Sequence, residues 1–268
     1  MKLALVGVGL IGGSFAAALR ASGEVDQVVG FDLDPEALSK GLAAGILDHA
    51  AGNLAGAVAA ADLVVLAVPV GAMRAALATI APHLPPGALV TDVGSTKVSV
   101  IADAQATLGD AIRRFVPAHP IAGGERPGVE HADPRLFRER LAITTPVADT
   151  DQEALAAVER LWRSVGARIE RLTPEAHDRI FAAVSHLPHV LAFALVEMIA
   201  RSADADAKFA HAGAGFRDFT RIAASSPQMW RDVCLANRAA LMSELNTYRE
   251  SLAALQDAID RADGAALE

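Results

Sequence analysis

The chain has 268 residues, of which 52% are hydrophobic, a net charge of −8 and a single cysteine, Cys234. A chain of this length and apolar content can bury one large core or two smaller ones. It has no run of basic residues, which disfavours a nucleic-acid partner, because such binding depends on clustered Lys and Arg. One cysteine excludes an internal disulfide. The sequence also lacks a long uncharged apolar stretch, so we expect a cytoplasmic protein with no membrane span.

A buried strand is predicted over 2–7 and a helix over about 11–22, and the sequence GVGLIG joins them. Its first glycine would permit a tight turn, its second would let a pyrophosphate approach the backbone, and its third would let the helix pack on the sheet. The start of the helix would offer free N–H groups to the phosphates. This N-terminus also has the composition of a secretory signal, but the glycine spacing favours a dinucleotide site. The predicted cofactor residues in this loop are Gly7, Gly9, Leu10, Ile11 and Gly12.

A second strand is predicted over 27–32 and ends in Asp32. A carboxylate at this position accepts hydrogen bonds from a ribose 2′-OH and repels a 2′-phosphate, which predicts NAD rather than NADP. Asp34 is an alternative ribose partner. Because Pro35 follows it, the sequence favours Asp34 as the N-cap of the next helix.

Further strands are predicted over 62–69, 87–95, 115–117 and 141–146, with helical segments between most of them. This alternation predicts a doubly wound parallel sheet of the Rossmann type. Ligands of such sheets bind at the carboxyl ends of the strands. Three residues near these ends complete the predicted cofactor site: Val68, Pro69 and Asp92.

His119 is set among turn-forming residues, with Pro117 and Pro120 on either side and glycines at 123 and 124. We expect it to lie on a constrained loop close to the nicotinamide ring.

The pattern becomes helical after about residue 172, and Thr173 followed by Pro174 is a plausible helix start. We therefore predict a dinucleotide-binding domain over 1–172 and an all-α substrate and dimerisation domain over 173–268. Pro188 should kink the first long helix of this second domain. His186 and His189 have a spacing that could bind a metal, but no Cys or carboxylate pattern completes a site, so no metal is expected.

Five blocks spread over roughly residues 5–237 resemble the prephenate/arogenate dehydrogenase family of tyrosine biosynthesis. They are GVGLIGGS, DVGSTK, HPIAGGERPGVEHADPRLF, SHLPHVLAFAL and GFRDFTRIAASSPQMWRDV. Within the family, the sequences of these blocks most resemble the bacterial cyclohexadienyl dehydrogenases. The resemblance implies NAD-dependent oxidative decarboxylation of prephenate or arogenate, to 4-hydroxyphenylpyruvate or tyrosine. It also implies a homodimer with its site in the cleft between a Rossmann domain and a helical domain. Tyrosine is a candidate inhibitor that would compete at this site.

The resemblance also implies roles for individual residues. His119 matches the catalytic base, and Ser95 matches a serine that bonds near the same substrate hydroxyl. Arg221 and Arg217 match arginines that bind the substrate carboxylates, and His189 matches a substrate-binding histidine. Glu125 and Asp218 match acidic residues that form ion pairs gating the site.

Several of these residues have an alternative role. Ser95 could be the N-cap of the following helix, and Arg217 stands where some relatives have Lys. Trp230 could lie near the substrate, at the dimer contact or in the core. His186 is expected to pack in the core and Lys97 to be a solvated residue in the first turn of its helix.

Two other functions are compatible with this architecture. A β-hydroxyacid dehydrogenase would use a catalytic lysine in the helical domain, but lysines occur only at positions 2, 40, 97 and 208, none of them in the AVSHLPH helix. A non-catalytic NAD-binding sensor is disfavoured by the intact set of His119, Ser95 and Arg221.

Overall fold

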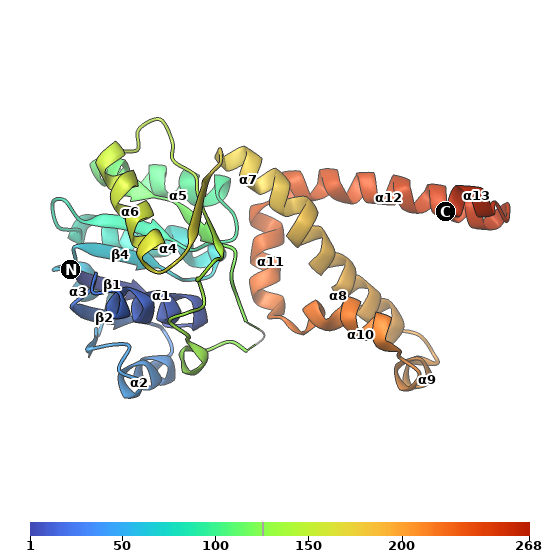
Figure 1. Ribbon diagram of the computed structural model, residues 1–268, viewed down its shortest axis with the longest axis horizontal. Helices are drawn as coiled ribbons and strands as arrows, with labels where there is room; N and C mark the ends of the chain where they lie inside the picture. The colour runs from blue at the N-terminus through green and yellow to red at the C-terminus, as the bar shows by residue number, and fades with distance from the viewer. Residues whose placement is uncertain (125) are drawn as a thin grey trace. The chain divides into compact units, whose positions relative to one another are not determined.

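The computed structural model describes residues 1–124 and 126–268, and Glu125 lies outside the described residues. The chain folds into two compact units, Met1–His177 and Asp178–Glu268, and each is described by itself (Figure 1).

The first unit is built on a six-stranded parallel sheet with the order β3-β2-β1-β4-β5-β6. Its strands are β1 (Lys2–Val6), β2 (Gln27–Phe31), β3 (His49–Ala50), β4 (Leu63–Leu66), β5 (Leu89–Asp92) and β6 (Phe115–Val116). The chain winds from β1 outward to β3, then returns to the other side of β1 to form β4. This reversal creates a switch point between β1 and β4, where dinucleotides bind in sheets of this order. The predicted doubly wound sheet is therefore confirmed.

Helices pack against this sheet and bury its apolar strands. They are α1 (Leu10–Ala21), α2 (Pro35–Ala43), α3 (Leu54–Val58), α4 (Met73–Ile80), α5 (Val98–Thr107) and α6 (Gln152–Ser164). Phe15 of α1 stacks on Trp162 of α6 with ring centroids 4.0 Å apart, and Phe137 packs edge-on against both rings. This aromatic cluster fixes α1, and with it the glycine loop at the start of α1.

A second, three-stranded sheet follows β6, which corrects the prediction that 141–146 belongs to the parallel sheet. It consists of β7 (Ala118–Pro120), β8 (Leu141–Thr144) and β9 (Arg168–Arg171), with β7 antiparallel and β9 parallel to β8. The change of sheet falls at Pro117, which has no N–H to donate to a continued ladder. His119 consequently lies in strand β7 rather than on the expected loop.

The second unit is helical, as predicted. The boundary between the two units falls within α7 (Pro174–Phe181). The elements after α7 are the π-helical turn η5 (Ala182–His186), α8 (Leu187–Ala200), α9 (Ala205–Ala210), α10 (Ala214–Thr220), the 3₁₀ turn η6 (Arg221–Ala224), α11 (Pro227–Ala236), α12 (Arg238–Asp260) and α13 (Gly264–Leu267). The π-helical turn η5 ends two residues before Pro188, which lacks the N–H that a regular helix would need at this point. The helix is thus interrupted where Pro188 was expected to distort it.

Two helices of the second unit expose unusual amounts of apolar surface. On α12, four exposed residues recur at helical spacing and form a stripe: Tyr248, Leu252, Leu255 and Ile259. The helical segment Pro174–Ala200 has a mean hydropathy of 1.6 over its most apolar window, and only 22% of that window is buried. By length and composition alone this segment could cross a membrane, although a core helix of a soluble protein passes the same test.

Candidate active site

The glycine loop between β1 and α1 has the geometry that a dinucleotide-binding loop needs. Gly7 has φ +94°, and a Cβ there would lie 2.5 Å from the carbonyl oxygen of Ala67. At Gly12 a Cβ would lie 2.6 Å from the carbonyl oxygen of Gly7. By contrast, a Cβ at Gly9 would meet no atom within 4 Å. The first and third glycines therefore satisfy the packing of the loop itself, whereas the second leaves open space where a pyrophosphate could approach the backbone.

Asp32, at the end of β2, lies beside this loop. Its carboxylate accepts hydrogen bonds from the backbone N–H groups of Val8, at 2.7 Å, and Asp34, at 2.9 Å. These bonds hold a carboxylate at the position expected of the ribose partner. Asp34 instead accepts a hydrogen bond from the backbone N–H of Glu36 and caps α2. The predicted capping role of Asp34 is thereby confirmed.

The ends of β4 and β5 lie at the same edge of the sheet as the glycine loop, because all four strands β1, β2, β4 and β5 are parallel. Val68 is half-buried and Pro69 is exposed, both just beyond β4. Ala67 and Val68 form the wall that a side chain at Gly7 would strike. The loop 93–97 follows β5 and carries Ser95, which is half-buried. Helix α5 begins at Val98 with Lys97 at its N-cap position, so Ser95 is not the N-cap of this helix.

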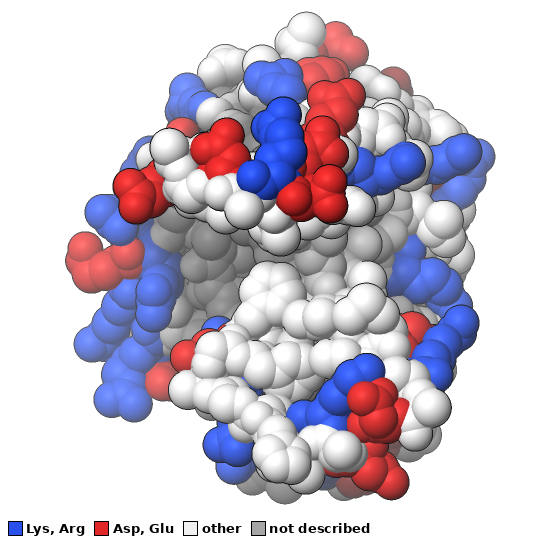
Figure 2. All heavy atoms as spheres, turned by 90° about the vertical axis from the view of Figure 1, so that its right-hand side faces the viewer, with Lys and Arg blue, Asp and Glu red and all other residues white. Residues whose placement is uncertain are grey.

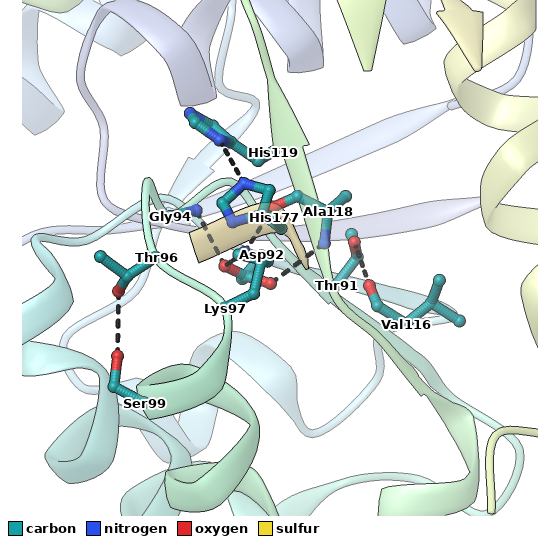
Figure 3. Close-up of polar contacts among 10 residues, drawn as sticks. All are labelled: Thr91, Asp92, Gly94, Thr96, Lys97, Ser99, Val116, Ala118, His119 and His177. Carbon is teal, nitrogen blue, oxygen red and sulfur yellow. Dashed lines mark hydrogen bonds and ion pairs between the residues drawn. The ribbon is translucent and has the colours of Figure 1, made fainter. Parts of the chain in front are cut away.

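Lys97 is fully buried, which makes the prediction of a solvated first-turn residue wrong. Its ammonium lies 2.5 Å from the carboxylate of Asp92, which is also fully buried. Asp92 further accepts hydrogen bonds from the backbone N–H groups of Gly94, at 2.8 Å, and Ala118, at 3.2 Å. The carboxylate predicted to contact the cofactor thus has protein donors on both oxygens (Figure 3).

His119 is half-buried on β7, and its ring contacts a second histidine that the sequence analysis did not single out. The Nδ1 atom of His119 lies 2.8 Å from Nε2 of His177, whose side chain is fully buried at the start of α7 (Figure 3). The two residues are 58 positions apart in sequence. No local motif marks His177, so only the tertiary structure reveals the pair.

In the second unit, His189 stacks on Trp230 with ring centroids 3.6 Å apart. Its Nδ1 atom lies 2.9 Å from the carbonyl oxygen of Ser185, so Nδ1 carries the proton and Nε2 is the acceptor nitrogen of the neutral ring. Burial lowers the pKa of His189, and the bond to Ser185 opposes this only in part. His186 is fully buried and its Nδ1 atom lies 3.1 Å from the amide nitrogen of Asn237, in keeping with its expected place in the core.

The predicted carboxylate-binding residues lie on α10 and the 3₁₀ turn that follows it. Arg217 and Asp218 are exposed on α10, and Arg221 is exposed at the first position of η6. Arg217 and Arg221 are four residues apart, a spacing that places side chains on one face of a helix. The predicted gating partner of this group, Glu125, lies outside the described residues.

Charged side chains are mixed in sign on the face that Figure 2 shows. Lys and Arg alternate with Asp and Glu, and the central part of this face carries few charges. Among the described residues, no three His, Cys, Asp or Glu side chains group as metal ligands.

The strand order, the glycine loop and the carboxylate at the end of β2 define a Rossmann-type domain with the features of a dinucleotide site. Two family models extend this class to a particular family. Residues 15–171 match the prephenate dehydrogenase nucleotide-binding domain, and residues 173–268 match the prephenate dehydrogenase dimerization domain. The chain belongs to the prephenate dehydrogenase family.

Individual relatives agree with this assignment. The chain is 37% identical to a cyclohexadienyl dehydrogenase of Zymomonas mobilis over 98% of this chain and 89% of the relative. A solved prephenate dehydrogenase of A. aeolicus, in complex with hydroxyphenyl propionate and NAD⁺, is 39% identical and superimposes with a TM-score of 0.93 over 100% of this chain and 93% of that one. An arogenate dehydrogenase of Synechocystis is 30% identical, with a TM-score of 0.81 over 99% and 94% of the two chains. The protein is thus an oxidoreductase of this family that uses NAD, and a β-hydroxyacid dehydrogenase is not favoured.

Proposed function

We propose that this protein catalyses the NAD-dependent oxidative decarboxylation of prephenate, arogenate or both. The C4–H hydrogen of the cyclohexadienol leaves as hydride while the C4 hydroxyl loses its proton to a base. The C1 carboxylate leaves as CO₂, and its bonding electrons complete the aromatic ring. The proton finishes on the phenol oxygen, so prephenate yields 4-hydroxyphenylpyruvate and arogenate yields tyrosine. Bound NAD⁺ supplies the hydride acceptor.

The observation that carries the proposal is the contact between His119 and His177. A base must present an acceptor nitrogen to the hydroxyl. If His119 donates its Nδ1–H to Nε2 of His177, then Nε2 is the acceptor nitrogen of the neutral His119 ring. His177 would therefore select the tautomer and support the imidazolium that forms, as the buried acid does in a catalytic triad. An imidazole suits this role because its ordinary pKa, about 6.5, lies close to neutral pH.

The remaining residues have binding roles in this proposal. Ser95, on the loop after β5, hydrogen-bonds near the same hydroxyl. Arg221 binds a substrate carboxylate with its guanidinium, Arg217 assists it, and His189 presents Nε2 to the substrate. Glu125 and Asp218 form the gate.

For the cofactor, we propose that Asp32 favours NAD⁺ over NADP⁺. Its carboxylate is already oriented by Val8 and Asp34, so it can accept hydrogen bonds from a ribose diol without reorganisation, and it would repel a 2′-phosphate. The loop residues Gly7, Gly9, Leu10, Ile11 and Gly12 would surround the pyrophosphate, with Val68 and Pro69 on the opposite wall. Asp92 would act at this edge through the backbone that it orders.

We further propose a homodimer formed through the second unit. The match to a dimerization domain over residues 173–268 supports it. The exposed stripe on α12 and the weakly buried segment Pro174–Ala200 supply the apolar area that a stable dimer needs. Covering these surfaces with a second copy accounts for their composition without a membrane, in a cytoplasmic enzyme. Tyrosine, which is the product of arogenate and resembles the product of prephenate, is the proposed competitive inhibitor.

The decisive experiment measures NADH formation by the purified protein with each substrate and each dinucleotide. We expect turnover of prephenate, arogenate or both with NAD⁺, and a lower kcat/KM with NADP⁺. Product analysis should find CO₂ and the aromatic acid in equal amounts with NADH. Binding of NAD⁺ without any NADH from either substrate would favour the non-catalytic sensor instead.

A further inference from the structure

The buried ion pair between Lys97 and Asp92 lies directly against the strand that carries His119. The ammonium of Lys97 donates a hydrogen bond to the carbonyl oxygen of Ala118, at 2.7 Å, and Asp92 accepts one from the N–H of Ala118. Both side chains are fully buried. The ion pair thus holds both backbone groups of the residue before the proposed base (Figure 3).

The need for this contact follows from the change of sheet at Pro117. Up to Val116 the chain pairs with β5, and the next ladder position would need an N–H that Pro117 lacks. Beyond Pro117 the strand pairs with β8, and the backbone of Pro117 and Ile121 bonds to that side. The N–H and carbonyl of Ala118 therefore point away from β8, towards the end of β5. Asp92 and Lys97 bond these two groups in place of the missing strand partner.

A neutral donor and acceptor could also bond these two backbone groups, but the charges of Lys97 and Asp92 make the bonds stronger. Charge-assisted hydrogen bonds are shorter and stronger than neutral ones, and inside the protein they resist displacement. Misplacing a catalytic group by about 1 Å can reduce the rate roughly 100-fold. A rigid anchor one residue before His119 limits such movement.

We propose that Lys97 and Asp92 are positioning residues for the dehydrogenation, which act through His119 by anchoring Ala118. This inference rests on the proposed function of His119 as the base. It does not require either residue to touch the substrate or NAD⁺. Lys97 thus has a role quite different from that of the catalytic lysine in β-hydroxyacid dehydrogenases.

The test is a double-mutant cycle between Lys97→Met and His119→Asn, read out as kcat, substrate KM and the dissociation constant of NAD⁺. We expect Lys97→Met to lower kcat at least about tenfold and to leave the NAD⁺ dissociation constant within about twofold. In the His119→Asn background the same change should lower kcat less than about threefold, because no base remains to be positioned. Equal losses in both backgrounds would show a general structural role and overturn the proposal.

A second variant covers the case in which Lys97→Met leaves the Asp92 charge buried and prevents folding. The pair Asp92→Asn with Lys97→Met removes both charges but still lacks the ammonium donor to Ala118. We expect it to fold and to keep a low kcat; parental kcat in this variant would overturn the proposal. Arg171→Met is the matched control, because it removes one of the two cations from the buried carboxylate of Glu159 in the same unit. We expect it to change kcat less than about twofold.

Nitrogen NMR of the His119 ring, assigned by its loss in His119→Asn, separates this inference from the proposed function. If the parental protein makes no NADH, the proposed function fails, but the ring signal still reports on the anchor. We expect the neutral pair variant to shift or broaden the His119 signal relative to the parental protein. An unchanged signal would overturn the positioning role.

Discussion

Nδ1 of His119 and Nε2 of His177 lie 2.8 Å apart, and the ring that His119 contacts is fully buried. Because two neutral imidazoles share one proton in such a contact, the tautomer of one ring fixes that of the other. The contact therefore makes His177 as important to the proposed chemistry as the histidine that would meet the substrate.

Replacing His177 should reveal this dependence. His177→Phe keeps a ring but removes the acceptor, so we expect kcat to fall about 10- to 100-fold. Loss of the acceptor should also destabilise the protonated, imidazolium form of His119. The acidic limb of the pH–rate profile should therefore move to lower pH. His177→Gln, whose amide oxygen can accept the same hydrogen bond, is the control and should retain more activity. Identical profiles for the two variants would argue against tautomer selection.

Gly7 and Gly9 should respond differently to the same substitution. Gly7→Ala forces a side chain onto a residue with φ +94° and against Ala67, so we expect a loss of about 2–4 kcal/mol in the free energy of unfolding. Gly9→Ala adds a methyl group in open space, so the protein should fold normally but bind NAD⁺ about tenfold more weakly. Denaturant unfolding and NAD⁺ titration of both variants measure this contrast. A destabilised Gly9→Ala protein would contradict the assignment of that space to the cofactor.

The cofactor preference should depend on Asp32 and not on Asp34. For Asp32→Ser we expect the kcat/KM ratio of NAD⁺ to NADP⁺ to fall at least about tenfold, because the repulsion of a 2′-phosphate is removed. Asp34→Ala should leave this ratio unchanged and reduce stability by about 0.5–2 kcal/mol, because α2 loses its N-cap. If Asp34→Ala instead altered the ratio, the ribose partner would have been misassigned.

The half-buried ring of His189 should make stability depend on pH. Its pKa is lower in the folded protein than the value of 6.5 that it has when unfolded, so the unfolded chain binds the proton more readily. The contribution of the neutral ring is then complete above about pH 6.5 and is lost as the pH falls from there through the folded pKa. Denaturant unfolding of the parental protein and of His189→Gln, which does not titrate, should give curves that converge as the pH is lowered. Parallel curves would contradict this account.

Arg221→Ala should test the proposed carboxylate site. We expect the substrate KM to rise by about 10- to 100-fold with a smaller effect on kcat, because a charge-assisted bond to a substrate carboxylate is lost in the ground state as well as the transition state. The dissociation constant of NAD⁺ should not change. Arg217→Ala is the companion variant, with a smaller expected effect. Unchanged kinetics for both would move the carboxylate site elsewhere.

Much of the parallel sheet could be predicted because its strands carry a local signal. Buried parallel strands such as β1, β4 and β5 are continuous apolar runs; Gly7 directly after β1 and Asp92 at the end of β5 mark the carboxyl edge. The glycine loop and Asp32 are likewise readable, since their spacing is set by a single βαβ unit. The change of sheet at Pro117 was missed because β7 has only three residues, and pairing between distant short strands leaves little trace in composition.

Lys97 and His177 were misjudged or overlooked for a related reason. A lysine near the first turn of a helix is usually solvated, and the sequence gives no sign that the loop 93–97 folds back to pair it with Asp92. His177 lies among polar helix residues, and its partner is on another element. Contacts made by the tertiary fold alone cannot be inferred from local periodicity.

The apolar stripe on α12 has a consequence for how this enzyme is handled. If a second copy covers Tyr248, Leu252, Leu255 and Ile259, dilution will favour separated protomers. The melting temperature and the specific activity will then both decrease as the protein concentration is lowered. Rates measured at very low enzyme concentration would then understate the turnover of the assembled form, and a charge introduced at Leu255 would reproduce that loss at any concentration.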